Sequence, residues 1–145
     1  APQRRIRYIM DRSIYNLRGI NYILKLGGAI PISNSAAKDA IKVAKKSLSE
    51  DNMIVIFPEG EISYDGDYGK FSKGYELIAK GLDGVIICAN IDGLKGSFFS
   101  RSKKHFIPKS SLFRREVTIT FSKPMSMNTK VEEVESSIKN LNSYK

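Results

Sequence analysis

Cysteine and histidine are almost absent from the sequence. Cys88 and His105 are each the single residue of their type, and there is no tryptophan. One cysteine cannot form a disulfide within the chain, and it excludes the cysteine clusters that bind structural zinc. A reducing compartment is therefore the expected setting, and no metal site is expected.

Long hydrophobic runs are also lacking. The longest are residues 53–57 and 85–89, well short of the roughly 20 apolar residues that a membrane-spanning helix needs. Residues 1–7 contain no apolar stretch of the kind found in a signal peptide. We therefore expect no membrane span and no signal peptide, and the absence of an initial Met suggests a piece of a longer chain.

Acidic residues are outnumbered, with 15 Asp and Glu against 24 Lys and Arg, for a net charge of +9. Such a chain attracts nucleic acid, phosphorylated small molecules, anionic lipid or an acidic carrier protein, and charge alone does not choose among them. The 145 residues are 41% hydrophobic, which is typical of a globular protein. The length predicts a single domain over residues 1–145.

The apolar pattern predicts alternating strands and helices. Strands are expected at residues 6–10, 29–32, 53–57, 85–91 and 117–121, and helices at 11–26, 36–50, 72–80 and from 129 onward. Residues 92–113 show no clear period and are expected to form a loop. This order predicts an α/β fold, with a mostly parallel central sheet flanked by helices and ligands beyond the carboxyl ends of its strands.

The most informative motif is Phe57-Pro58-Glu59-Gly60, which directly follows the apolar run 53–57 and continues to Ser63. Pro58 ends the strand, Glu59 places a carboxylate at its carboxyl end, and Gly60 allows a sharp turn or a close ligand. The alternative interpretation is a strand-to-loop turn with an incidentally exposed Glu.

This motif resembles the third motif of the lysophospholipid and glycerol-phosphate acyltransferase family. Residues 28–32 stand where that family has its second motif, and residues 85–91 where it has its fourth. Residues 57–63, 92–93 and 99–101 are similar to the acyltransferase domain of bacterial bifunctional 2-acylglycerophosphoethanolamine acyltransferase/acyl-ACP synthetases. The resemblance implies a glycerol-3-phosphate acyltransferase-like fold.

The sequence departs from the family at the first motif, in which four residues separate a His from an Asp. The one histidine, His105, is followed five positions later by Ser110, so it does not form that pair. We expect His105 to be solvated or structural. We therefore expect the catalytic pair upstream of residue 1, so that the N-terminal part of the domain is missing and this chain alone is inactive.

The resemblance implies transfer of a fatty acyl group from acyl-ACP or acyl-CoA to a lysophospholipid, such as 2-acylglycerophosphoethanolamine, with no cofactor. It places the reaction at the cytoplasmic face of the bacterial inner membrane. The residues that it assigns to the substrate are Phe57, Pro58, Glu59, Gly60, Ser63, Lys70 and Lys73. Glu59 would organise the polar head of the acceptor, and Lys70 and Lys73 would attract its phosphate, unless they lie in a solvated loop.

A basic stretch with interleaved aromatic residues follows residue 93. Phe99, Arg101, Lys103 and Lys104 could contact an anionic membrane or an acidic acyl carrier protein, or could simply keep the fold soluble. The competing interpretation of the whole chain is a non-enzymatic basic module for anionic membrane or nucleic acid. That interpretation does not account for the motif in residues 57–63, so no nucleic-acid partner is expected.

Overall fold

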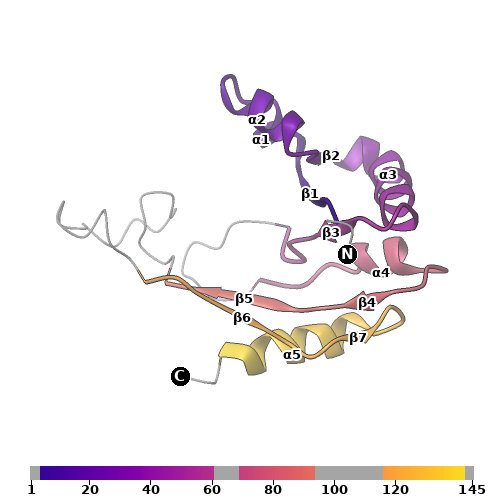
Figure 1. Cartoon of the computed structure of the whole chain (residues 1–145), viewed down its shortest axis with the longest axis vertical. Coiled ribbons are helices and arrows are strands. Elements are labelled where there is room, and N and C mark those ends of the chain that lie inside the picture. Colours follow the sequence, from indigo (N-terminus) through magenta and orange to yellow (C-terminus); the bar gives the residue numbers. More distant parts are fainter. Residues whose placement is uncertain (1–3, 61–68, 94–115, 143–145) are drawn as a thin grey trace. The chain divides into compact units, whose positions relative to one another are not determined.

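The structure is a computed structural model that describes residues 4–60, 69–93 and 116–142 (Figure 1). Its internal contacts divide the chain into two compact units. The first unit comprises Ala1–Pro58 and Lys73–Asp83, and the second comprises Glu59–Ser72 and Gly84–Lys145. Each unit is described separately below, and the single acyltransferase domain stays a prediction.

The first unit contains a small parallel sheet of three strands in the order β2-β1-β3. These strands are β1 (Ile6–Asp11), β2 (Ile30–Ile32) and β3 (Met53–Val55). The carboxyl half of β1 pairs with β2, and its amino half pairs with β3. The parallel arrangement expected for these three strands is confirmed, and β1 is the central one.

Helix α3 (Ala37–Ser49) supplies most of the helical side of the core in the first unit. Its apolar stripe was expected from the spacing of Ile41, Ala44 and Leu48, and Ala44 is fully buried. The core cluster joins α3 to the sheet and to α4 (Gly74–Ala79); its buried members are Ile9, Ile30, Ala40, Ala44 and Ile78. A 3₁₀ turn, η1 (Asn34–Ala36), precedes α3.

The helix expected over residues 11–26 is instead two helices, α1 (Arg12–Tyr15) and α2 (Ile20–Leu26). The expected start is confirmed, because the Asp11 side chain caps α1 by accepting from the backbone N–H of Ser13 at 2.7 Å. The break falls at Gly19, whose φ of 90° is incompatible with a continuous helix. A single long helix was therefore the wrong prediction.

The second unit contains an antiparallel ribbon rather than a further parallel strand. Strands β4 (Val85–Ile86) and β5 (Ala89–Asp92) pair with β7 (Met125–Ser126) and β6 (Thr118–Phe121), respectively. The prediction of one buried parallel strand over residues 85–91 is wrong, since the run is interrupted and Val85 is 59% exposed.

A bulge explains the interruption. The register places Val85 opposite Ser126 but Ala89 opposite Phe121, so the partner strand contains one extra residue between the two ladders. Ser122 joins the ladders, because its Oγ accepts from the Cys88 N–H and its own N–H donates to the Cys88 carbonyl, both at 2.9 Å.

Helix α5 (Val131–Asn142) packs against β5 in the second unit (Figure 1). The apolar stripe expected for this helix is confirmed, with Val131, Val134 and Ile138 buried. Cys88 of the ribbon is also buried, as a small residue of the core.

Candidate functional site

The parallel sheet places the ends of its strands at one edge of the first unit. Asp11, the last residue of β1, lies opposite Ile32, the last residue of β2. β3 ends earlier, with Val55 opposite Tyr8. Residues beyond the carboxyl ends of parallel strands are the usual position of ligand sites in α/β folds, so the segment that follows Val55 is the first candidate.

Strand β3 lies at the edge of the sheet, so the strand expected over residues 53–57 is not buried on both faces. Met53 is 44% exposed and Phe57 is 60% exposed. The strand is also shorter than expected and ends at Val55. Edge strands bury only part of their side chains, so an apolar run alone did not determine the position of β3 in the sheet.

The motif residues make a turn after β3. Pro58 lacks a backbone N–H and cannot continue a ladder, and Pro58 and Glu59 form the turn. Gly60 has a φ of +69°, the left-handed region that favours glycine, while the space around its Cβ position is open. Gly60 is therefore required by its backbone conformation and not by crowding.

Glu59 is held by a hydrogen bond from a residue further along the chain. Its Oε2 accepts from the backbone N–H of Gly69 at 3.0 Å, ten positions along the chain. Glu59 is half-buried, and Gly69 is exposed. A carboxylate has about four acceptor positions on its two oxygens, so this bond leaves capacity to accept a second hydrogen bond from a ligand hydroxyl.

The two lysines assigned to phosphate lie in different units. Lys70 follows Gly69 in the second unit, so its backbone is next to the point where Glu59 is held, and its side chain is exposed. Lys73 is exposed in the first unit, at the N-cap of α4. The first turn of α4 also contains Glu76, whose charge already complements the helix start. Any phosphate affinity here would therefore come from lysine charge.

The sequence reasoning missed a bond that supports the second motif. Arg7 in β1 donates from Nε to the Gly28 carbonyl oxygen at 2.9 Å. Gly28 has a φ of +68°, and a Cβ there would lie 3.4 Å from Arg7 Nε. The bond therefore joins β1 to the turn that leads into β2. No spacing rule identifies a pair of residues 21 positions apart.

Gly93 and Glu116, the described residues on either side of residues 94–115, approach one another closely. A Cβ at Gly93 would lie 2.1 Å from the Glu116 carbonyl oxygen, and the φ of Gly93 is +88°. Only glycine fits this position. The predicted membrane or carrier contacts Phe99, Arg101, Lys103 and Lys104 lie within residues 94–115, outside the described residues, and Ser63 also lies outside them.

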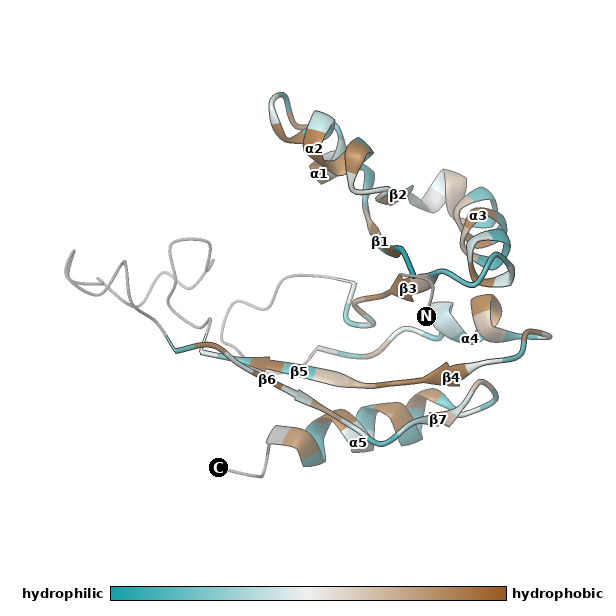
Figure 2. Ribbon diagram, viewed as in Figure 1, coloured by the Kyte–Doolittle hydropathy of each residue, from teal (hydrophilic) through white to brown (hydrophobic). Residues whose placement is uncertain are grey.

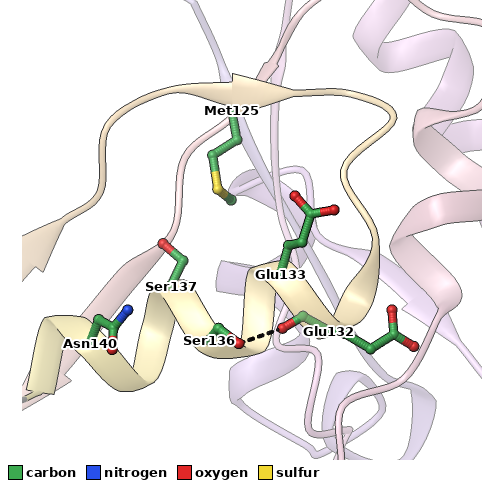
Figure 3. Close-up of a pocket in the computed structure, with 6 residues that line it drawn as sticks. All are labelled: Met125, Glu132, Glu133, Ser136, Ser137 and Asn140. Carbon is green, nitrogen blue, oxygen red and sulfur yellow. Dashed lines mark hydrogen bonds between the residues drawn. The ribbon is translucent and has the colours of Figure 1, made fainter.

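A shallow surface pocket is present elsewhere on the second unit, between β7 and α5 (Figure 3). It is lined by Met125, Glu132, Glu133, Ser136, Ser137 and Asn140. Ser136 donates from Oγ to the backbone carbonyl of Glu132 at 2.8 Å, as Figure 3 shows. Two carboxylates at its rim disfavour a phosphorylated ligand, so this pocket does not compete with the Glu59 motif.

Two features are absent from the described ranges. Within residues 4–60, 69–93 and 116–142, no group of three His, Cys, Asp or Glu side chains is placed to hold a metal ion. No helix in the same ranges is both long enough and apolar enough to cross a membrane.

Comparison with known proteins gives the family of the chain. No solved structure matches the chain. The sequence model of the family described as Acyltransferase matches residues 1–92. The matched region includes the three parallel strands, the turn with Glu59, and strands β4 and β5. Because the match extends over more than half of the sequence, the chain belongs to the acyltransferase family.

Proposed function

We propose that this chain is part of a glycerophospholipid O-acyltransferase. It transfers a fatty acyl group from acyl-ACP or acyl-CoA to a lysophospholipid, and 2-acylglycerophosphoethanolamine is the proposed acceptor. The proposal includes the bifunctional acyltransferase/acyl-ACP synthetase type and a location at the cytoplasmic face of the bacterial inner membrane. Membership of the acyltransferase family supports the reaction type.

The observation that carries the proposal is the position of Glu59. Its carboxylate follows the end of a parallel strand, and the N–H of Gly69 orients it. A carboxylate fixed in this way accepts a hydrogen bond from a hydroxyl of the glycerol backbone or head group. Such charge-assisted bonds contribute about 1.5–3 kcal/mol, enough to position an acceptor for attack.

The reaction is an acyl transfer between a thioester and an alcohol. The acceptor hydroxyl oxygen attacks the thioester carbonyl, the C–S bond breaks, and the hydroxyl proton passes through a base to the leaving sulfur. In the proposed family mechanism the base is a His paired with an Asp five positions further on, and these 145 residues contain no such pair. Glu59 binds the acceptor and does not act as this base.

The other residues of the proposed substrate site contribute positive charge or backbone conformation. Lys70 and Lys73 add positive charge on either side of Phe71, and we assign them to the acceptor phosphate. Phe57, Pro58, Gly60 and Ser63 form the rest of the proposed substrate site. Phe99, Arg101, Lys103 and Lys104 are assigned to contact with anionic membrane or with acyl carrier protein.

An acyl-transfer assay with two proteins tests this proposal. The first protein is the 145-residue chain, and the second is the same chain extended upstream to include the His-x-x-x-x-Asp pair. With labelled acyl-ACP or acyl-CoA and a series of lysophospholipids, we expect product only from the extended protein. Equal turnover by the two proteins would contradict the assignment of the base, and no turnover by either on any lysophospholipid would contradict the function.

A further inference from the structure

Helices α1 and α2 expose an apolar surface in the first unit. Neither helix contains a buried residue. The exposed fractions in α2 reach 68% for Tyr22, 67% for Ile23 and 72% for Leu26. With the neighbouring residues of α1 and the connecting turn, the exposed apolar side chains are Ile14, Leu17, Ile20, Tyr22, Ile23 and Leu26. We call these six residues the α1–α2 surface.

The exposed residues of α2 lie together on one side of the helix. Residues three and four positions apart are neighbours on a helix surface. Tyr22 therefore neighbours Leu26, which neighbours Ile23, which in turn neighbours Ile20. Leu24, at the border of this side next to Ile20, is half-buried. In Figure 2 the brown of apolar residues is prominent on both α1 and α2.

Basic residues occur beside the α1–α2 surface, and this part of the sequence contains no acidic residue. Arg12, Arg18 and Lys25 belong to α1, the turn and α2, and all three are exposed. No Asp or Glu occurs from Arg12 to Lys38. The nearest carboxylate, Asp11, accepts hydrogen bonds from the Ser13 N–H and the Ser13 hydroxyl. The surface is thus apolar with cations around it.

This combination fits the interfacial region of an anionic bilayer. Apolar side chains enter the boundary between head groups and acyl chains, while Lys and Arg remain among the anionic head groups. Tyr22 has the amphipathic character that is enriched at membrane interfaces. A nucleic acid would use the cations but would leave most of the apolar side chains in water.

We infer that the α1–α2 surface docks the protein onto an anionic lipid bilayer. The inference rests on the proposed function in one respect, since that function makes the bilayer the source of the acceptor. Binding to lipid, however, is measured without any turnover. α1 begins at Asp11, the carboxyl end of the central strand. Docking through this surface therefore holds the carboxyl edge of the parallel sheet near the membrane that contains the lysophospholipid.

Vesicle sedimentation with the 145-residue chain tests the inference. The probes are phosphatidylglycerol vesicles and phosphatidylcholine vesicles at low and high salt. We expect binding to phosphatidylglycerol that weakens with salt, because exposed charges are screened over about 8 Å at physiological ionic strength. Binding to phosphatidylcholine should be much weaker.

Two pairs of variants assign the binding to this surface. Replacing both Tyr22 and Leu26 by Ser should weaken binding at least tenfold, whereas Leu77→Ser changes a 56% exposed residue of α4 and should have little effect. Replacing both Arg18 and Lys25 by Ser should weaken binding about fivefold for each cation removed. Lys38→Ser with Lys42→Ser, on exposed positions of α3, is the matched charge control.

Three outcomes would overturn the inference. The first is full vesicle binding by the variant with Tyr22 and Leu26 replaced, with its circular dichroism unchanged. The second is that the unchanged protein forms an oligomer and does not bind vesicles, and that the variant is monomeric. This result would assign the surface to self-association. The third is preference for duplex DNA over phosphatidylglycerol vesicles. Vesicle binding by the 145-residue chain, together with no acyl transfer by the extended protein on any lysophospholipid, would contradict the proposed function and leave the docking inference standing.

Discussion

The Glu59 carboxylate and the Gly69 backbone N–H are joined by a hydrogen bond of 3.0 Å across ten positions of sequence. The bond connects the turn after β3 to the chain that leads into α4. Glu59 therefore has a structural role that the motif alone did not indicate. A substitution that tests the charge of Glu59 must therefore keep this hydrogen bond. Glu59→Gln does so, because the amide oxygen of Gln can still accept a hydrogen bond from the Gly69 N–H.

Asp11 provides a prediction on the acid side of the pH range. Hydrogen bonds from the side chain and then the backbone of Ser13 lower the pKa of the Asp11 carboxyl below its ordinary value. Because the folded pKa is lowered, the stabilising contribution is present above the unfolded pKa and is lost as pH falls through the folded pKa.

A carboxyl titration followed by NMR measures this effect. We expect the Asp11 pKa to lie below that of an aspartate in an unstructured peptide, and Ser13→Ala to raise it. An unchanged Asp11 pKa in Ser13→Ala would show that the hydrogen bond from the Ser13 hydroxyl is not the main cause of the lowered pKa.

Gly93→Ala should be strongly destabilising. A methyl group at Gly93 would lie 2.1 Å from the Glu116 carbonyl oxygen and would also have to adopt a φ of +88°. Overpacking of this kind costs about 1–3 kcal/mol, and a left-handed backbone adds about 1 kcal/mol. Urea denaturation measures the loss as a free energy of unfolding.

Gly81→Ala is the matched control for Gly93→Ala. Gly81 has a φ of +77°, and no atom lies within 4 Å of its Cβ position. Only the backbone term of about 1 kcal/mol should appear. Equal losses for the two variants would mean that Gly93 and Glu116 are further apart in solution.

Ile30→Ala tests the core of the first unit. Ile30 is 2% exposed in the cluster that joins β2 to α3, so truncation should cost about 2–5 kcal/mol in the free energy of unfolding. Ile23→Ala, at a residue 67% exposed, should change that free energy by no more than about 0.5 kcal/mol. A small loss for Ile30→Ala would contradict the packing of β2 against α3.

Sequence patterns predicted a helix well where the spacing of apolar residues within that helix alone determines which side is buried. The stripe with Ala44 in α3 and the stripe with Val134 in α5 follow from helical spacing alone, and both are buried. The break at Gly19 was missed because apolar spacing continues across it. A glycine within such a pattern is compatible with either a helix or a turn.

Pairing between distant segments could not be derived from the sequence in the same way. The run from Val85 to Ile91 has the composition of a buried parallel strand, but the bulge at Ser122 and the partner strand determine its direction and exposure. The bond of Glu59 to Gly69 depends on the path of a loop. The motif therefore located the candidate site, and the structure supplied what holds its carboxylate.

The most direct test of the proposed function compares Glu59→Gln with Glu61→Gln in the chain extended to include the upstream His-x-x-x-x-Asp pair. Glu61 is adjacent to the motif in sequence and lies outside the described residues. The measurement is kcat/KM for acyl transfer to a lysophospholipid, with Tm recorded for each variant. We expect Glu59→Gln to lower kcat/KM by roughly tenfold to a hundredfold with little change in Tm, and Glu61→Gln to cost much less. Full activity in Glu59→Gln, or a loss that follows unfolding, would contradict the proposed role of Glu59 in holding the acceptor.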